Sequence, residues 1–278
     1  MAGRVAGKVA LVTGAARGQG RSHAVRLAEE GADIIAVDIC GQIGSVPYPM
    51  GTEDDLAQTV KDVEALDRRI VACRADVRGY EELDSAVDRG VRELGRLDIV
   101  SANAGISGAG RMEEMPEQTW QDVIDVNLTG VWHTAKAAVR HLRAAGGGSI
   151  IITSSVCGLK GMPNIGHYVA AKHGVVGLMR TLALELGADG IRVNCVHPTG
   201  VDTGMIHNDF TYELFAPDLP PDQRTREELA QRFGASNILQ VPWVSPRDIS
   251  NAVLWLASDE SRFVTGTSLP VDAGHTTV

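Results

Sequence analysis

The sequence predicts an α/β protein whose single domain is a doubly wound parallel sheet of about seven strands flanked by helices. Short, continuous apolar runs, typical of strands buried on both faces of a sheet, alternate along the chain with amphipathic helical patterns. A glycine-rich turn joins the first such run to the first helix. No internal repeat, linker or low-complexity tract interrupts the series, so residues 1–278 are predicted to form one domain.

The N-terminal half of the chain alternates regularly between the two patterns. Residues 8–13 and 33–38 are apolar runs on either side of a helical pattern at 21–30, which together make a βαβ unit. Thr52 begins the next predicted helix, which runs to about Leu66. The series continues with a strand at 70–75, a helix at 80–94 and a strand at 97–102.

The C-terminal half begins with a long apolar pattern at residues 116–145, which predicts one helix that bends near Gly130. Ser245 is expected to cap the last helix. The remaining predicted elements are a strand at 149–153, a helix to about Leu186, a strand at 191–196, a helix at 247–257 and a strand at 268–271.

Two segments lack a regular period. Residues 39–51 contain two prolines and several glycines, and they follow a strand, so they predict a loop at the ligand crevice of the sheet. Residues 199–241 combine weak periodicity with polar tracts and prolines, which indicates a mobile segment with short helices. We expect it to bind the substrate.

Composition argues against several classes of function. The formal net charge is −9 with acidic and basic residues interspersed, so nucleic acid or an anionic membrane would be repelled. No apolar run approaches the roughly 20 residues that span a bilayer. The four cysteines are scattered and no secretory leader precedes them, which favours a reducing, cytoplasmic setting. The eight histidines lack metal-ligand spacing, so no metal site is expected.

Gly14, Gly18 and Gly20 lie where a predicted strand passes into a helix. Glycine there permits a tight turn and the close approach of a pyrophosphate to backbone N–H groups at the helix N-terminus. Asp38 ends the next predicted strand, where its carboxylate can accept hydrogen bonds from an adenosine ribose and would repel a 2′-phosphate. Arg17 could instead contact such a phosphate, but we give Asp38 more weight and predict NAD. A turn that binds nothing and a solvated Asp38 are the alternatives.

Tyr168 and Lys172 stand four residues apart in a predicted helix and therefore on one face. A nearby ammonium favours the phenolate and lowers the pKa of a tyrosine from about 10, which permits proton abstraction near neutral pH. An incidental pair on a solvated face is the alternative, so this pair counts only together with the other motifs.

Five motifs in order resemble the short-chain dehydrogenase/reductase family. They are Thr13-Gly-Ala-Ala-Arg-Gly-Gln-Gly20, Asn103-Ala-Gly105, Asn127, Ser155 and Tyr168-Val-Ala-Ala-Lys172, and the match extends over essentially the whole chain. The resemblance implies a Rossmann-type subunit, usually a homotetramer, that moves hydride between a nicotinamide cofactor and an alcohol or carbonyl.

The resemblance also implies roles for single residues. Tyr168 is the base, and Ser155 binds the substrate hydroxyl. Lys172 lowers the pKa of Tyr168, holds the nicotinamide ribose and passes the proton to a water near Asn127. Together with Tyr168 and Lys172, the cofactor is expected to contact Gly14, Arg17, Gly18, Gln19, Gly20, Asp38, Ile39, Asp76, Val77, Asn103, Ala104, Gly105, Pro198, Thr199, Val201 and Thr203. Thr199 replaces a glycine that the family usually has, which puts the contact with the nicotinamide amide in doubt.

A narrower resemblance lies in three stretches: Asp38-Ile-Cys40 with Ser45-Val-Pro-Tyr-Pro-Met50, the long helix to Asp67-Arg-Arg69, and His197-Pro-Thr-Gly-Val-Asp-Thr203. These are similar to the carveol-dehydrogenase-like branch, whose members are described as dependent on mycofactocin. That similarity implies an NAD that does not exchange and is reoxidised in place by a peptide-derived redox carrier. Independently of it, an apolar loop with two prolines at the crevice can close over a bound dinucleotide.

The predicted activity is therefore oxidation of a secondary alcohol, hydrophobic and cyclic, to the ketone by tightly bound NAD. Two alternatives remain. One is an NAD(P)H-dependent ketone or 3-oxoacyl reductase with exchangeable cofactor, and the other is a non-catalytic NAD-binding regulator, which the presence of all four catalytic residues argues against. The side chains expected to line the substrate site are Met205, Ile206, Phe210, Tyr212, Leu214 and Phe215.

Overall fold

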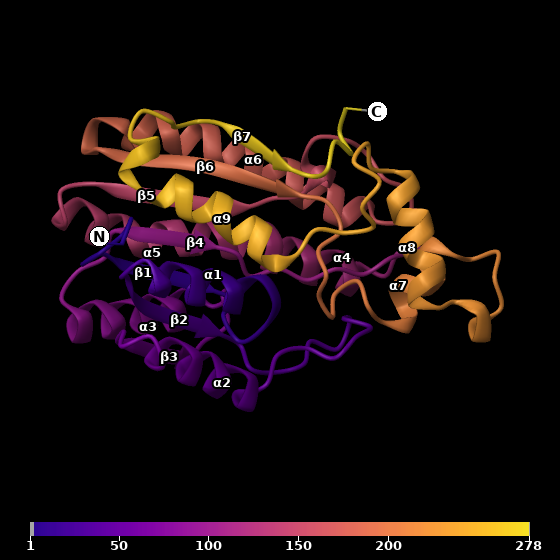
Figure 1. Cartoon of the computed structure of the whole chain (residues 1–278), viewed down its shortest axis with the longest axis horizontal. Helices are drawn as coiled ribbons and strands as arrows, with labels where there is room; N and C mark the ends of the chain where they lie inside the picture. Colours follow the sequence, from indigo (N-terminus) through magenta and orange to yellow (C-terminus); the bar gives the residue numbers. More distant parts are fainter. Residues whose placement is uncertain (1–2, 278) are drawn as a thin grey trace.

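A computed structural model of the chain describes residues 3–277, and these form a seven-stranded parallel sheet in the order β3-β2-β1-β4-β5-β6-β7 (Figure 1). The predicted fold class is confirmed, while residues 1, 2 and 278 of the predicted domain lie outside the described part. The strands are β1 (Val9–Thr13), β2 (Asp33–Asp38), β3 (Ile70–Arg74), β4 (Ile99–Ala102), β5 (Gly148–Thr153), β6 (Ile191–Pro198) and β7 (Ser268–Val271).

The strand order reverses direction at β1, which pairs with β2 on one side and β4 on the other. Thr13, the last residue of β1, pairs in register with Val37 of β2. Loops that leave β1 and β4 therefore diverge to opposite sides of the sheet, and a crevice opens at the carboxyl ends of the strands. This edge is where the predicted site residues gather.

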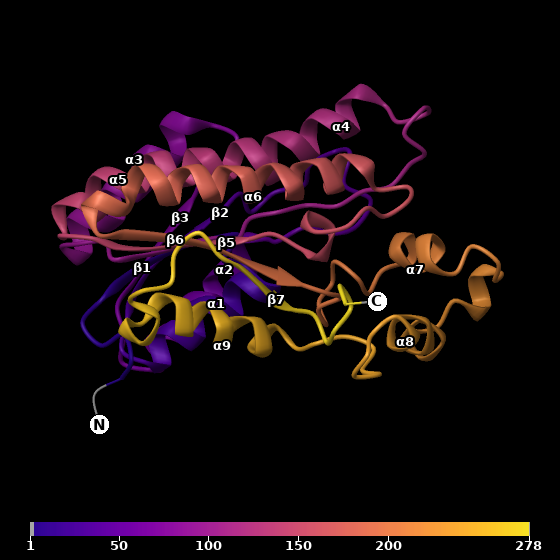
Figure 2. The ribbon, with the colours of Figure 1, turned by 90° about the horizontal axis from the view of Figure 1, so that it is seen from above.

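Helices cover both faces of the sheet (Figure 2). α3, α5 and α6 lie on one face, and α1 and α9 pack against each other on the other face. Strand residues alternate between the two cores: Val9 and Leu11 belong to the first, and Ala10 and Val12 to the second. Because both faces are buried, the strands are continuous apolar runs rather than alternating ones.

Helices α2, α7, α8 and α9 begin at residues whose side chains accept from a free N–H group of the first turn. Thr52 and Ser245 each form a capping box, with Asp55 and Asp248 respectively, as the sequence signals predicted. The helices are α1 (Gly18–Glu29), α2 (Glu53–Glu64), α3 (Tyr80–Leu94), α4 (Glu117–Ile124), α5 (Gly130–Ala144), α6 (Gly166–Leu186), α7 (Asp209–Phe215), α8 (Arg226–Ala235) and α9 (Pro246–Ala257).

The long predicted helix at residues 116–145 is not regular throughout. A π-helical turn, Asp125–Thr129, joins α4 to α5 immediately before Gly130. A Cβ at Gly130 would come within 2.6 Å of the Val77 side chain. Glycine there lets the helix pack closely against Val77, in the loop that follows β3. The irregular turn thus falls where the sequence predicted a bend, with Asn127 at its centre.

The segment 199–241 contains two short helices, α7 and α8, which stand beyond the carboxyl edge of the sheet (Figure 1). Their position places this segment next to the crevice, while residues 39–51 form an irregular loop on the β2 side. Across residues 3–277, no helix has both the length and the apolar character needed to cross a membrane.

Candidate active site

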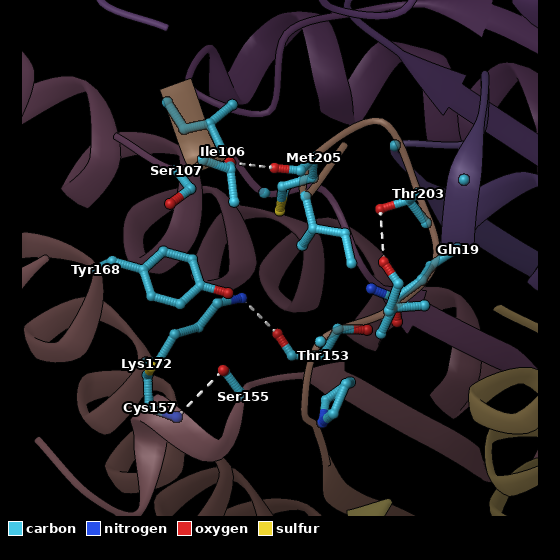
Figure 3. A pocket seen from close by; sticks show the side chains of 18 of the residues that line it. Gln19, Ile106, Ser107, Thr153, Ser155, Cys157, Tyr168, Lys172, Thr203 and Met205 are labelled. Atoms are coloured by element: carbon cyan, nitrogen blue, oxygen red, sulfur yellow. Dashed lines mark hydrogen bonds between the residues drawn. The ribbon is translucent and has the colours of Figure 1, made fainter. Parts of the chain in front are cut away.

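A cavity of about 1090 Å³ opens at the carboxyl edge of the sheet. It is lined by the glycine-rich turn, residues 39–51, the start of α6 and the segment after β6 (Figure 3). The cavity brings together every predicted catalytic and cofactor-binding residue except Asn127: Gly14, Arg17, Gly18, Gln19, Gly20, Asp38, Ile39, Asp76, Val77, Asn103, Ala104, Gly105, Ser155, Tyr168, Lys172, Pro198, Thr199, Val201 and Thr203.

The glycine-rich turn needs glycine for two different reasons. Gly14 and Gly18 have φ of +68° and +56°, in the left-handed region that other residues rarely adopt. A Cβ at Gly20 would lie 1.9 Å from the carbonyl oxygen of Gly14, so only hydrogen fits there. The turn therefore brings the N-terminus of α1 close to the cavity, which is the arrangement that binds a pyrophosphate.

Asp38 lies at the end of β2 and is only 8% exposed. Its Oδ2 accepts from the N–H of Ala16 at 2.9 Å, and its Oδ1 accepts from the N–H of Cys40 at 2.9 Å. The carboxylate thus ties the glycine-rich turn to the start of loop 39–51 while it also lines the cavity. The Arg17 guanidinium donates to the carbonyl of Pro49, on the same loop.

Asn103 joins the ends of three neighbouring strands. Its Nδ2 donates to the carbonyl of Thr13 at 3.0 Å, and its N–H donates to the Thr13 hydroxyl at 3.1 Å. The Thr153 hydroxyl donates to its Oδ1 at 3.4 Å. The side chain therefore fixes the base of the cavity, and Thr13 and Thr153 support it in a role that the motifs did not predict.

Asn127 is fully buried behind the cavity rather than on its surface. Its Oδ1 accepts from the N–H of Ile106 and its Nδ2 donates to the carbonyl of Ile106, both at 2.8 Å. The side chain thus binds both backbone polar groups of a single residue in the loop after β4. Asn127 thereby anchors the cavity wall that Ile106 forms.

Tyr168 and Lys172 project from the first turns of α6 into the cavity, next to Ser155 (Figure 3). The Lys172 Nζ lies 5.4 Å from the centre of the Tyr168 ring and donates to the carbonyl of Thr153 at 2.7 Å. The Ser155 Oγ accepts from the N–H of Cys157 at 3.1 Å. The predicted phenol, ammonium and hydroxyl are therefore neighbours.

His197, which is buried, lies behind Ser155 on β6. Its Nδ1 is 2.8 Å from the carbonyl oxygen of Ser155, so Nδ1 carries the proton and donates. The contact fixes the backbone that carries the Ser155 hydroxyl.

The segment after β6 supplies one apolar part of the cavity wall. Met205, Ile206, Phe210, Leu214 and Phe215 line the cavity as predicted. Tyr212 does not line it, because its hydroxyl lies 3.2 Å from the Nδ1 of His207.

Asn237 joins this segment to two distant parts of the chain. Its Oδ1 accepts from the Thr199 hydroxyl at 3.4 Å and lies 3.1 Å from the Nδ1 of His275, near the C-terminus. Its Nδ2 donates to the carbonyl of Val241 at 2.7 Å. Thr199 thus uses the hydroxyl that distinguishes it from the family's glycine. His275 is a cavity residue that no sequence motif indicated.

Comparison with known proteins decides the family: residues 8–213 match the one described as short chain dehydrogenase. The chain belongs to the short-chain dehydrogenase family. It is 56% identical over 275 residues to a (-)-trans-carveol dehydrogenase of Rhodococcus erythropolis, covering 98% of this chain and 99% of that protein. It is 34% identical over 271 residues to a 3-oxoacyl-[acyl-carrier-protein] reductase of Thermotoga maritima, covering 98% of each.

Among solved structures, a carveol dehydrogenase from Mycobacterium avium in complex with NAD superimposes with a TM-score of 0.97. The two are 59% identical, and the match covers 99% of this chain and 100% of that one. The predicted family and its narrower carveol-dehydrogenase-like branch are thereby confirmed, and the chain is an oxidoreductase of the short-chain dehydrogenase family.

The pKa of Tyr168 departs from the expectation for this short-chain dehydrogenase. Burial raises it above its usual value of 10.0, and the neighbouring Ser155 hydroxyl only partly opposes the rise. Burial also lowers the pKa of Lys172 to about 8. The net shift of the phenol is therefore opposite to the predicted one, because desolvation of the phenol dominates it.

Tyr48 is the cavity residue that motif reasoning missed most clearly. It is 5% exposed, its hydroxyl accepts from the N–H of Ser107 at 2.9 Å, and burial raises its pKa to about 12. It lies near enough to Tyr168 that its charged form would raise the pKa of that residue. The only signal in the sequence was its place in an apolar loop that follows β2.

Proposed function

We propose that the protein oxidises a hydrophobic, cyclic secondary alcohol to its ketone, using NAD that it holds tightly. The observation that carries this proposal is one cavity in which Tyr168, Lys172 and Ser155 lie between a glycine-rich turn and an apolar wall. The relative named for trans-carveol, an alcohol of this class, supports the substrate. Binding of NAD by the similar solved structure supports the cofactor.

The residues present fit a dinucleotide. The turn at Gly14 to Gly20 would hold the pyrophosphate, Asp38 the adenosine ribose, and Asp76 with Val77 the adenine. Lys172, whose Nζ already lies at the cavity base, would hold the nicotinamide ribose. The bound cofactor supplies one piece of chemistry, the acceptance of hydride.

The chain itself moves the proton. The substrate hydroxyl would hydrogen-bond to Ser155 and Tyr168, which aims its C–H bond away from these residues. Tyr168, as phenolate, would take the hydroxyl proton, and the ammonium of Lys172 would stabilise the negative charge that this requires. A water near Asn127 would return the proton to solvent. The apolar wall from Met205 to Phe215 would exclude other water and select cyclic substrates.

The branch resemblance extends the proposal to turnover. Loop 39–51 contributes Ile43, Tyr48 and Met50 to the cavity wall, so a bound dinucleotide would lie beneath it. We propose that NAD does not exchange and is reoxidised in place by a peptide-derived redox carrier such as mycofactocin. A homotetramer in the cytoplasm completes the proposal, and the four buried, unpaired cysteines are consistent with a reducing compartment.

One experiment separates this function from its nearest alternative. Protein purified without added cofactor is dialysed exhaustively, and its nicotinamide absorbance is recorded before and after one equivalent of a cyclic secondary alcohol is added. We expect bound NAD that is reduced in a single turnover. A protein that emerges without dinucleotide and reduces ketones with added NADPH would instead be a reductase with exchangeable cofactor.

Asp38→Asn tests the choice of NAD over NADP. The substitution keeps one acceptor for the N–H groups of Ala16 and Cys40 but removes the charge beside the ribose. The ratio of the dissociation constants for NADP and NAD should fall by about tenfold or more, because repulsion of the 2′-phosphate is lost. Equilibrium binding to protein stripped of dinucleotide measures the ratio, and an unchanged ratio would assign discrimination to another residue.

A further inference from the structure

Loop 39–51 is organised around one side chain, Gln42. Its Nε2 lies within hydrogen-bond distance of the carbonyls of Ile43, Val46 and Tyr48, at 3.2, 3.0 and 3.2 Å. Its Oε1 accepts from the N–H of Met50 at 3.1 Å. These contacts join the two arms of the loop, so the loop moves as one body. A contact between one loop residue and the rest of the chain can therefore position all of it.

Ser45, at the far end of the loop, makes one such contact, beside the Arg17–Pro49 and Ser107–Tyr48 contacts. The Ser45 hydroxyl donates to the Oδ2 of Asp122 at 2.7 Å. Asp122 belongs to α4 and is only 5% exposed, so its carboxylate is removed from water and depends on protein partners. A hydrogen bond to a buried charge is stronger than one between neutral groups. Opening the loop would cost this contact.

The same carboxylate is linked through Arg78 to Asp76, at the adenine end of the proposed cofactor site. The Nη1 of Arg78 donates to the Oδ1 of Asp122 at 3.0 Å. Arg78 in turn holds Asp76, through Nε at 2.8 Å and Nη2 at 2.7 Å, and its own N–H donates to the Asp76 Oδ1 at 2.9 Å. Asp76 lines the cavity, whereas Asp122 and Arg78 do not. The chain of contacts therefore runs from the loop to the cavity through residues that never touch its contents.

We infer that Asp122 is a positioning residue that couples closure of loop 39–51 to the adenine end of the dinucleotide site. This inference rests on the proposed function. When a dinucleotide occupies the site, its adenine fixes Asp76, which fixes Arg78, and Arg78 holds the Asp122 carboxylate in the position that binds Ser45. Release of the dinucleotide requires the loop to open, so the Ser45–Asp122 hydrogen bond slows release without entering the chemistry.

Ser45→Ala tests the loop side of this coupling, with Gln118→Ala as the matched control. The Gln118 Nε2 donates to the same Asp122 Oδ1 at 3.1 Å, but it comes from α4 and contacts no part of the loop through this bond. We expect Ser45→Ala to release NAD about 10- to 100-fold faster, and Gln118→Ala to stay within about twofold of the parent. Exchange of bound NAD against isotopically labelled NAD, in the whole protein, gives both rates.

Asp122→Asn tests the shared carboxylate. One amide oxygen cannot replace two carboxylate oxygens that serve Ser45 and Arg78, so release should accelerate at least as much as in Ser45→Ala. Adding Ser45→Ala to Asp122→Asn should then change the rate little, because both substitutions remove one coupling. The single-turnover rate of NAD reduction by the alcohol, measured with NAD saturating, should remain near the parent value in each variant, which a general loss of structure would not permit.

Three results would overturn the inference: unchanged NAD exchange in Ser45→Ala, equal acceleration in Gln118→Ala, or additive effects of Ser45→Ala and Asp122→Asn. Failure of the proposed function is a different observation, because the parent protein would then bind no dinucleotide or turn over without Tyr168.

Discussion

Tyr168→Phe is expected to reduce turnover by a factor of about 10² to 10⁴ while leaving NAD bound, which is the range that a positioned proton acceptor contributes. The ring of Tyr168 packs against the core with the residues of α6, and phenylalanine preserves that packing. Only the proton acceptor is lost. Single-turnover reduction of bound NAD by a cyclic secondary alcohol measures the rate, and the absorbance of the dinucleotide reports its retention.

A second phenol in the cavity provides the contrast. Tyr48→Phe removes the hydroxyl that accepts from the Ser107 N–H but leaves a phenol at position 168. It should therefore lose much less turnover than Tyr168→Phe. Near-normal activity in Tyr168→Phe, or a larger loss in Tyr48→Phe, would transfer the role of base away from Tyr168.

Lys172→Met is expected to lower kcat by a factor on the order of 10², since it removes the only ammonium beside the developing phenolate among the described residues that contact Tyr168. The pH at which oxidation reaches half its maximum should also rise, because Tyr168 is already harder to deprotonate through burial and would lose its cationic neighbour. Initial rates between pH 6 and 10 check both outcomes, and an unshifted profile would mean that the charge of Lys172 does not act on the phenol.

The same variant should reveal the cost of burying Lys172. The pKa of Lys172 is about 8 in the folded protein, below its ordinary value of 10.5. The unfolded chain therefore binds this proton more tightly than the folded protein does. Burial of the charged Lys172 therefore destabilises the folded protein fully below pH 8 and no longer destabilises it above pH 10.5. The difference in free energy of unfolding, Lys172→Met minus parent, should fall by about 3 kcal/mol as pH rises through this window. Urea unfolding at several pH values measures it, and a constant difference would contradict it.

The strands were predictable because their burial on both faces leaves a direct trace in the sequence. Residues 33–38 and 268–271 match β2 and β7 in full, and the other strand boundaries move by one or two residues. The start of α1 was predicted late, at residue 21 instead of Gly18, because glycines do not read as helix. At the start of α1 the glycines instead serve the tight turn that precedes the helix.

The catalytic pair was predictable from spacing, because four residues on a helix fix the relative position of two side chains. The pKa of Tyr168 was not, since desolvation depends on what other parts of the chain bring around the ring. The roles of Ser45, Tyr48 and Asp122 were not predicted, for a related reason. Their partners lie tens of residues away, and no local period records such contacts.

The single amide of Asn237 binds Thr199 just after β6, Val241 at the end of the following segment, and His275 of the C-terminal tail. Grafting the 203–240 stretch of a relative into this protein, in order to change which alcohol it accepts, would import a new residue at that junction with no matching tail. Chimaeras should therefore exchange the C-terminal residues around His275 together with that stretch, and a graft that omits them should accept a broader and less defined range of alcohols.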